Sequence, residues 1–304
     1  MSTAHKSLIG ASPEEVRARL GPLEPLLCPI CEIDQAQPFA TDWYGFRIVR
    51  CAGCDLLYLN PRPSYSWLIE NIYSDEYHHS LASVDEPLDQ NRRALFERQL
   101  NGIERHVRPG RLLDVGCGQG GFLGFAARRG WQVFGTEVSP QWITGLEKAL
   151  PQGTFFCGQM DEVDFRGHRF EAIRLNHVLE HTRNPARELA RAAELLGPGG
   201  VVYLSVPNAA SLDTRWKNLL SRLWLKRKRY RHFTTLHHLW YFTPKTLGRL
   251  ANSVGLLAAG LETPVYFTQQ QRDTAFASVY RALLEPAGLG NCVDAYLVKP
   301  PDGE

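Results

Sequence analysis

The chain has 304 residues, of which 44% are hydrophobic and 22% charged, and its formal net charge at pH 7 is +2. This composition is typical of a globular protein, and the small net charge excludes a chain-wide attraction to nucleic acid, so any basic binding surface must be local. Residues 1–27 lack the pattern of a secretory signal, and no apolar run is long enough to cross a membrane. We therefore expect a cytoplasmic protein.

Composition and periodicity divide the chain into four parts. We expect an N-terminal helix within residues 1–24, a cysteine-rich unit over 25–62, a bridging segment over 63–90, and a domain of alternating strands and helices over 91–304 with a basic insertion at 211–236. The odd number of cysteines, seven, with four of them in two close pairs, favours reduced thiols or metal ligands over a disulfide framework.

The first helix has a recognisable start. Ser12 is a suitable N-cap, Pro13 suits the first helical position, and Glu15 completes a capping box. In the bridging segment, which is rich in proline and aromatic residues, Tyr77 could close over a pocket, although ordinary packing is the simpler role.

The sequences CPIC and CAGC form two C-x-x-C pairs separated by nineteen residues. This spacing is typical of a zinc ribbon, and the stretch FATDWYGFRIVR between the pairs favours short strands around a turn. A redox dithiol is the alternative. Because four thiolates leave no open coordination position for water, we expect a structural zinc ion. Its ligands would be Cys28, Cys31, Cys51 and Cys54.

From about residue 90 the pattern predicts an α/β fold. A helical pattern over residues 92–107 is followed by the apolar runs RLLDVG, QVFGTEV, TFFC, EAIRLN and VVYLSV, separated by helical or loop stretches. Helices should begin at Asn184 and Thr243, each of which precedes a proline, and the run CVDAYLVKP should form a final edge strand. We expect a Rossmann-like, mostly parallel sheet of about seven strands with helices on both faces.

The stretch RLLDVGCGQGGF fits two glycine-rich templates. One is the G-x-G-x-x-G turn that binds a dinucleotide pyrophosphate, and the other is an acidic D-x-G-x-G-x-G turn formed by Asp114, Gly116, Gly118 and Gly120. A carboxylate at the strand end repels a pyrophosphate and favours a cationic group. Glu137, at the end of the next strand, can accept hydrogen bonds from both hydroxyls of a ribose. An adenosine with a cationic amino-acid tail fits both features.

Several motifs then agree in order and spacing with one family. LDVGCGQGGF, VFGTEVS, FEAIRLNHVLEH, LLGPGGVVYLSVPN and HHLWYFTPKTLGRLANSVGL resemble class I S-adenosylmethionine-dependent methyltransferases over about residues 90–260. The resemblance implies that the turn of Gly116, Gly118 and Gly120 approaches the methionine part of the cofactor and that Glu137 holds the ribose. It also implies roles for two further pairs: Met160 and Asp161 would border the adenine, and Asn176 and His177 would line the floor near the methyl group.

The leading ribbon is similar to the one in bacterial sugar C-methyltransferases and their relatives in surface-polysaccharide pathways. In those enzymes a histidine in a Y-H-E-H stretch removes a proton from the sugar, and this chain has TLHHLWYFT there, with His238 at the position of the base. Thr235 and His237 replace the tyrosine and the glutamate, and the sequence ends before the large C-terminal domain of those enzymes. Methylation of a hydroxyl is therefore at least as well favoured as methylation of carbon. His181 is the second candidate base.

The basic stretch RWKNLLSRLWLKRKRYRHF, residues 215–233, predicts an amphipathic helix whose apolar residues recur at helical spacing. It could be a lid over the substrate cleft, or it could make a peripheral contact with an anionic membrane through residues 215–231. RNA binding is a third reading.

Three functions remain open. The first is an enzyme that methylates a small molecule, such as a sugar or a nucleotide- or lipid-linked sugar. The second is an RNA methyltransferase, which is disfavoured because LNHVLEH lacks the prolines and aromatic residue of enzymes that methylate base amino groups. The third is a noncatalytic module with a degenerate cofactor site.

Overall fold

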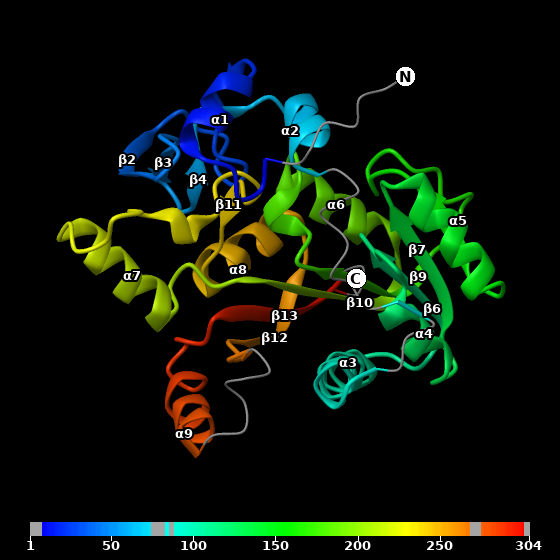
Figure 1. Ribbon diagram of the computed structural model, residues 1–304. Helices are drawn as coiled ribbons and strands as arrows, with labels where there is room; N and C mark the ends of the chain where they lie inside the picture. Colours follow the sequence, from blue (N-terminus) through cyan, green and yellow to red (C-terminus); the bar gives the residue numbers. More distant parts are fainter. Residues whose placement is uncertain (1–7, 74–82, 85–87, 268–274, 301–304) are drawn as a thin grey trace.

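The computed structural model describes residues 8–73, 83–84, 88–267 and 275–300 (Figure 1). Tyr77 lies outside the described residues.

A seven-stranded sheet forms the centre of the molecule, in the order β12-β13-β10-β9-β6-β7-β8. Where pairings are described, neighbouring strands are parallel except around β13, which is antiparallel to both of its neighbours. The strands are β6 (Arg111–Val115), β7 (Gln132–Glu137), β8 (Thr154–Cys157), β9 (Phe170–Asn176), β10 (Leu196–Pro207), β12 (Leu257–Glu262) and β13 (Cys292–Val298). The predicted mostly parallel sheet is confirmed.

One strand was placed wrongly by the sequence pattern. We expected the last apolar run to be an edge strand, but β13 lies between β10 and β12. Its residues are almost all buried, as expected for an internal strand, whereas β12 is mostly exposed and forms the edge. The pattern missed β12 because its sequence LAAGLE has no apolar alternation.

Helices cover both faces of this sheet. Leu112 and Leu113 are adjacent in β6 and both fully buried, yet they belong to different hydrophobic clusters, so each face has its own core. The helices are α3 (Gln90–Glu104), α4 (Gly121–Ala127), α5 (Pro140–Ala149), α6 (Pro185–Leu195), α8 (Pro244–Ser253) and α9 (Ala275–Leu284). The predicted starts at Asn184 and Thr243 are confirmed, because each side chain accepts hydrogen bonds from backbone N–H groups of the first turn.

The N-terminal part contains α1 (Pro13–Arg19), where the capping box of Ser12 and Glu15 is present as expected. The other elements are β1 (Leu23–Glu24), β2 (Ala36–Thr41), β3 (Arg47–Cys51), β4 (Leu57–Leu59), β5 (Arg62–Pro63) and α2 (Tyr65–Asn71). Strands β2 and β3 form the short strands expected around a turn.

The cysteine-rich unit shares a sheet with the larger domain. Its three strands continue into β11 (Trp240–Tyr241), which comes from the chain beyond β10 and pairs with β4, giving the order β11-β4-β3-β2. The two parts are therefore joined by backbone hydrogen bonds as well as by the covalent chain. Beside β11 lie two short 3₁₀ turns, η2 (Leu179–His181) and η3 (Arg231–Phe233).

The basic insertion is only partly helical. Helix α7 (Leu212–Arg222) ends eleven residues before the end of the expected helix at 233. After it, the Arg229 side chain donates to the Ser221 carbonyl and the Tyr230 N–H donates to the Ser221 hydroxyl, so the chain folds back. Four consecutive cations would repel each other on a helix, which favours this turn. Among the described residues, no helix is both long and apolar enough to span a bilayer.

Candidate functional site

The glycine-rich turn follows β6 at the carboxyl edge of the sheet, where ligands bind in folds of this type. Gly116, Gly118 and Gly120 have φ angles of 63°, 53° and 73°, which are accessible to glycine at little cost. A side chain at Gly120 would also collide with Leu146, at 2.2 Å. These glycines are required by the turn itself, and the turn exposes backbone rather than side chains to a ligand.

Glu137 ends β7 beside this turn. Its Oε2 accepts from the Gly118 N–H at 3.0 Å, and its Oε1 accepts from Val138 and Ser139. The carboxylate is thus fixed in orientation, and Oε2 retains a lone pair that could accept from a ribose hydroxyl. Glu137 therefore fits the role expected for it.

Asp114 has a different environment from the one that we expected. Its carboxylate is 1% exposed, and its Oδ1 lies 2.7 Å from Nη1 of Arg174, its cross-strand neighbour on β9. Burial raises the pKa of Asp114, and the Arg174 guanidinium opposes this shift. Since Arg174 compensates the negative charge, the expected attraction between Asp114 and a cationic ligand is much weaker than the sequence suggested.

Arg174 extends this pair into a buried network. The guanidinium donates to Oε1 of Gln99 on α3 and lies 3.9 Å from the ring centroid of Phe122. Gln99 in turn donates to Oδ1 of Asn176 at 2.9 Å. The network therefore fixes the side chain of Asn176, the residue expected at the floor of the site. Sequence reasoning missed Arg174 and Gln99, although an arginine within the buried strand EAIRLN signals that an acid lies nearby.

Met160 and Asp161 follow β8 at the same edge of the sheet as the glycine turn. Met160 is fully buried. Asp161 contacts Arg187 through Oδ2 at 3.4 Å, while its Oδ1 is buried and has no hydrogen-bond partner among the described residues. A buried acceptor without a donor is costly, and the exocyclic amino group of an adenine would satisfy it. This orphaned atom is an independent reason to expect an adenosine here.

His177 follows β9 with a φ angle of 53°, unusual for a residue that is not glycine. Its backbone N–H donates to the Ser205 carbonyl, and its ring Nδ1 lies 3.2 Å from Oε1 of Glu180. Burial lowers the pKa of His177, but contacts with Cys292 and Glu180 outweigh this effect and raise it overall. The net shift favours the protonated form of His177 beside Glu180, although the His177 side chain is 42% exposed.

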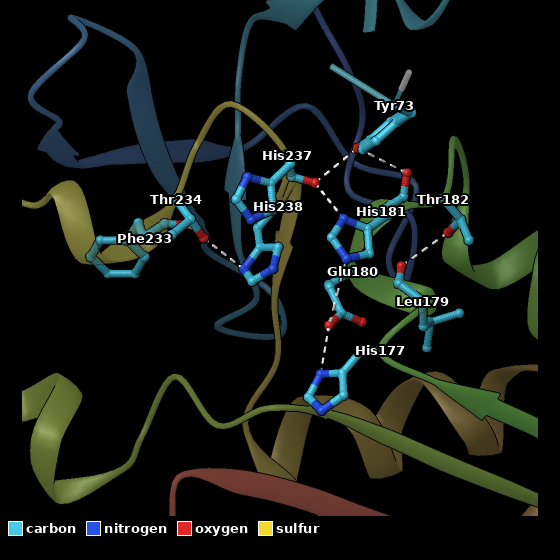
Figure 2. A network of polar contacts seen from close by, with 10 residues as sticks. All are labelled: Tyr73, His177, Leu179, Glu180, His181, Thr182, Phe233, Thr234, His237 and His238. Atoms are coloured by element: carbon cyan, nitrogen blue, oxygen red, sulfur yellow. Dashed lines mark hydrogen bonds and ion pairs between the residues drawn. The ribbon is translucent and has the colours of Figure 1, made fainter. Parts of the chain in front are cut away.

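The two candidate bases, His181 and His238, come from separate segments and meet with ring centroids 4.8 Å apart (Figure 2). The Nδ1 of His181 lies 2.6 Å from the His237 carbonyl, which can only accept, so Nδ1 carries the proton. The Nδ1 of His238 lies 2.8 Å from the Thr234 hydroxyl, which already donates its hydrogen to the Phe233 carbonyl. In a neutral His238 ring, Nε2 is therefore the atom that can accept a proton, whereas Nε2 of His181 lies 3.9 Å from Oε1 of Glu180.

The surroundings of His238 favour its neutral form. Burial, and then the neighbouring His181 and His237 rings, lower the pKa of His238 well below its usual value. Its ring also lines a small cavity of about 40 Å³ together with His232, Trp240 and Tyr241. A neutral imidazole beside a cavity can receive a proton from a bound group.

Glu180 connects these histidines and was not singled out from the sequence. Its side chain is 1% exposed and lies near both His177 and His181, at 3.2 and 3.9 Å. Burial raises its pKa, but the histidines outweigh this and lower it, so Glu180 is ionised. The spacing of His177 and Glu180 in NHVLEH, three residues apart on one turn, was the signal that could have identified it.

The four predicted zinc ligands lie together. The sulfur atoms of Cys28, Cys31, Cys51 and Cys54 are all within 4.8 Å of one another, and those of Cys28 and Cys54 are 3.5 Å apart. Zinc–sulfur bonds of about 2.3 Å in a tetrahedron place sulfurs slightly under 4 Å apart, so this cluster fits one zinc ion. Three of these cysteines are buried, as suits a structural site.

Residues 84–258 match the model of a family described as a methyltransferase domain. This chain belongs to that methyltransferase family. The matched segment contains the glycine turn, Glu137 and both candidate bases, and the expectation of a methyltransferase is confirmed. The cysteine-rich unit precedes it.

This methyltransferase is similar to several known proteins. The ubiquinone biosynthesis O-methyltransferase of Nitrobacter winogradskyi is 31% identical over 152 residues, which is 48% of this chain and 56% of that protein. An uncharacterized 37.1 kDa protein in transposon TN4556 of Streptomyces fradiae is 26% identical over 71% of this chain and 65% of its own length. The structure of the N-methyltransferase NodS from Bradyrhizobium japonicum, in complex with S-adenosyl-L-homocysteine, has a TM-score of 0.48 and 12% identity, and the match covers 78% of this chain and 98% of that one.

Proposed function

We propose that this methyltransferase transfers the methyl group of S-adenosylmethionine to a hydroxyl or carbon of a small molecule. The acceptor would be a sugar, or a nucleotide- or lipid-linked sugar, of a bacterial cell-surface or secondary-metabolite pathway. The observation that carries the proposal is the contact between the rings of His181 and His238, with centroids 4.8 Å apart, beyond the same sheet edge as the glycine turn. The name of the Nitrobacter relative, an O-methyltransferase, supports transfer to oxygen.

The residues present fit the cofactor. Glu137 would accept from the ribose and Asp161 from the adenine amino group, while Gly116, Gly118 and Gly120 would leave room for the methionine part. When bound, S-adenosylmethionine supplies an electrophilic methyl group on a cationic sulfur.

The protein would act mainly by positioning. Holding the acceptor atom about 3 Å from the methyl carbon contributes up to roughly 7–11 kcal/mol to an in-line displacement. A hydroxyl acceptor must also lose a proton, and Nε2 of His238 would accept it, contributing about 10² to 10⁴ in rate. His181 is the alternative acceptor of this proton. The zinc ion would be structural and takes no part in the transfer.

The test has two stages. Calorimetry with S-adenosylmethionine should give a heat of binding, and its absence would remove the enzymatic proposal in favour of a noncatalytic module. Labelled S-adenosylmethionine would then be incubated with nucleotide sugars, lipid-linked sugars and tRNA. Label transferred to a sugar supports the proposal, and label transferred only to tRNA contradicts it.

A further inference from the structure

A group of large apolar side chains is exposed on and just after α7. Ser221 is the one buried residue of that helix. Five side chains, which we call the tryptophan surface, are between 45% and 77% exposed: Trp216, Leu219, Leu223, Trp224 and Leu225. A lid that covered the substrate cleft with its apolar face would bury these side chains, so this structure does not support the lid reading. Such a concentration of exposed apolar residues marks an interaction site.

The chain around this surface is strongly basic. Residues 212–231 contain eight Lys and Arg residues and one acid, Asp213, which pairs with Lys217. The rest of the chain then has 26 basic and 31 acidic residues, so the positive charge is concentrated at this place. The Arg229 guanidinium lies 3.6 Å from the Trp224 ring centroid, which holds the exposed indole in place.

The cations also form a concave site. A shallow concavity of about 420 Å³ is lined by Lys226, Arg227, Lys228, Arg231 and His232. Its lining contains no acid, so it suits a phosphate group. An apolar surface with indole rings beside a basic concavity is the combination expected of a segment that lies in the interface of an anionic bilayer.

This surface adjoins the candidate active site. His232 lines the basic concavity and also the small cavity beside His238. Its Nε2 lies 2.9 Å from Oδ1 of Asn218 on α7, which ties the two regions together. In Figure 1, α7 lies at the periphery of the molecule, on the side away from α5.

We propose that the tryptophan surface and the basic concavity dock the protein on an anionic membrane, with lipid phosphate groups in the concavity. If the proposed function holds, on which this step rests, the contact would present a lipid-linked acceptor to His238. The apolar side chains enter the interface, and the cations remain at the headgroups.

The experiment measures sedimentation with phosphatidylcholine vesicles, with and without phosphatidylglycerol. The chain should bind only the anionic vesicles. Neutralising the concavity with K226Q/R227Q/K228Q should weaken binding roughly a hundredfold, equivalent to about 1 kcal/mol for each cation. W224A/L225A should weaken it at least about tenfold, because two side chains no longer leave water. The matched control V279A/L283A removes two exposed apolar side chains of α9 and should bind as the unaltered protein does.

Calorimetry with S-adenosylmethionine on each variant shows whether the fold is intact and separates the two proposals. Vesicle binding without cofactor binding leaves the docking proposal standing while the proposed function fails. An equal loss of vesicle binding in W224A/L225A and in the control V279A/L283A overturns the docking proposal. So does a change of oligomeric state in W224A/L225A without vesicles, which would make the surface a protein interface. Salt-sensitive RNA binding without vesicle binding overturns it in favour of RNA.

Discussion

The buried pair of Asp114 and Arg174 is a direct test of the electrostatics at the glycine turn. Arg174→Met keeps a side chain of similar length but removes the cation that compensates Asp114, whose carboxylate is 1% exposed and 2.7 Å from the guanidinium. An uncompensated buried charge costs about 3–5 kcal/mol of the free energy of unfolding. For a chain of 304 residues the melting temperature should fall by roughly 5–8 °C.

The pH dependence of this loss has a definite sign. Burial raises the pKa of Asp114, and without Arg174 nothing from that side opposes the shift. A carboxyl whose folded pKa exceeds its unfolded pKa stabilises the fold at low pH, and this stabilisation is lost as pH rises through the folded pKa. The deficit of Arg174→Met against the unaltered protein should therefore be larger at pH 8 than at pH 5.

Chemical denaturation at both pH values, monitored by tryptophan fluorescence, measures this difference. The control is Asp114→Asn combined with Arg174→Met, which removes both charges and should recover much of the lost stability. If the single and double variants unfold at the same denaturant concentration at pH 8, the ion pair does not carry the stability that we assign to it.

Three further outcomes are expected. His238→Gln should lower kcat by a factor of about 10² to 10⁴ and leave the cofactor affinity, measured by calorimetry, nearly unchanged. Because burial and the neighbouring histidines hold the pKa of His238 well below 6.5, kcat/KM of the unaltered enzyme should fall only on the acid side of that pH. Unchanged turnover in the variant would exclude His238 as the base. Burial raises the pKa of Glu188 to about 7, so the free energy of unfolding should fall as the pH rises from about 4.5 to 7. In denaturant titrations, Glu188→Gln should therefore have a free energy of unfolding up to about 3 kcal/mol larger than that of the unaltered protein at pH 8, and an equal one at pH 4. Purified protein should release one zinc ion per chain to a chelator, as measured with a colorimetric zinc indicator. Cys54→Ser should abolish that release and make the N-terminal part sensitive to proteolysis. Release of one zinc ion per chain from the variant would contradict the proposed ligand set.

The features predicted correctly from the sequence are those that local chemistry determines. The helix starts at Ser12, Asn184 and Thr243 depend on side chains that bind backbone N–H groups within the same turn. The four cysteines lie together as expected, because each C-x-x-C pair already brings two sulfur atoms close within one turn of chain. Parallel strands separated by helices leave few alternatives for the sheet.

The errors concern contacts between distant residues. Asp114 and Arg174 are sixty positions apart, and only the register of β6 against β9 makes them neighbours. Helical periodicity in the basic insertion continued past Arg222, but the repulsion among Lys226–Arg229 and the hydrogen bonds back to Ser221 end the helix. The position of β13 likewise depends on β12, whose sequence has no strand pattern of its own.

The cysteine-rich unit contacts the segment that carries His238, so a zinc ion in the four-cysteine cluster would support that segment. Tyr58 of β4, four residues after Cys54, pairs with Trp240 of β11, and the Leu59 N–H donates to the carbonyl of Leu239. His238 directly precedes that residue. With zinc bound, the thiolates would hold the chain just before β4, which pairs with β11, the strand that follows His238. The position of His238 would then depend on a strand whose geometry the metal supports. Zinc loss should therefore reduce turnover far more than it reduces binding of S-adenosylmethionine, because the glycine turn and Glu137 belong to the other sheet.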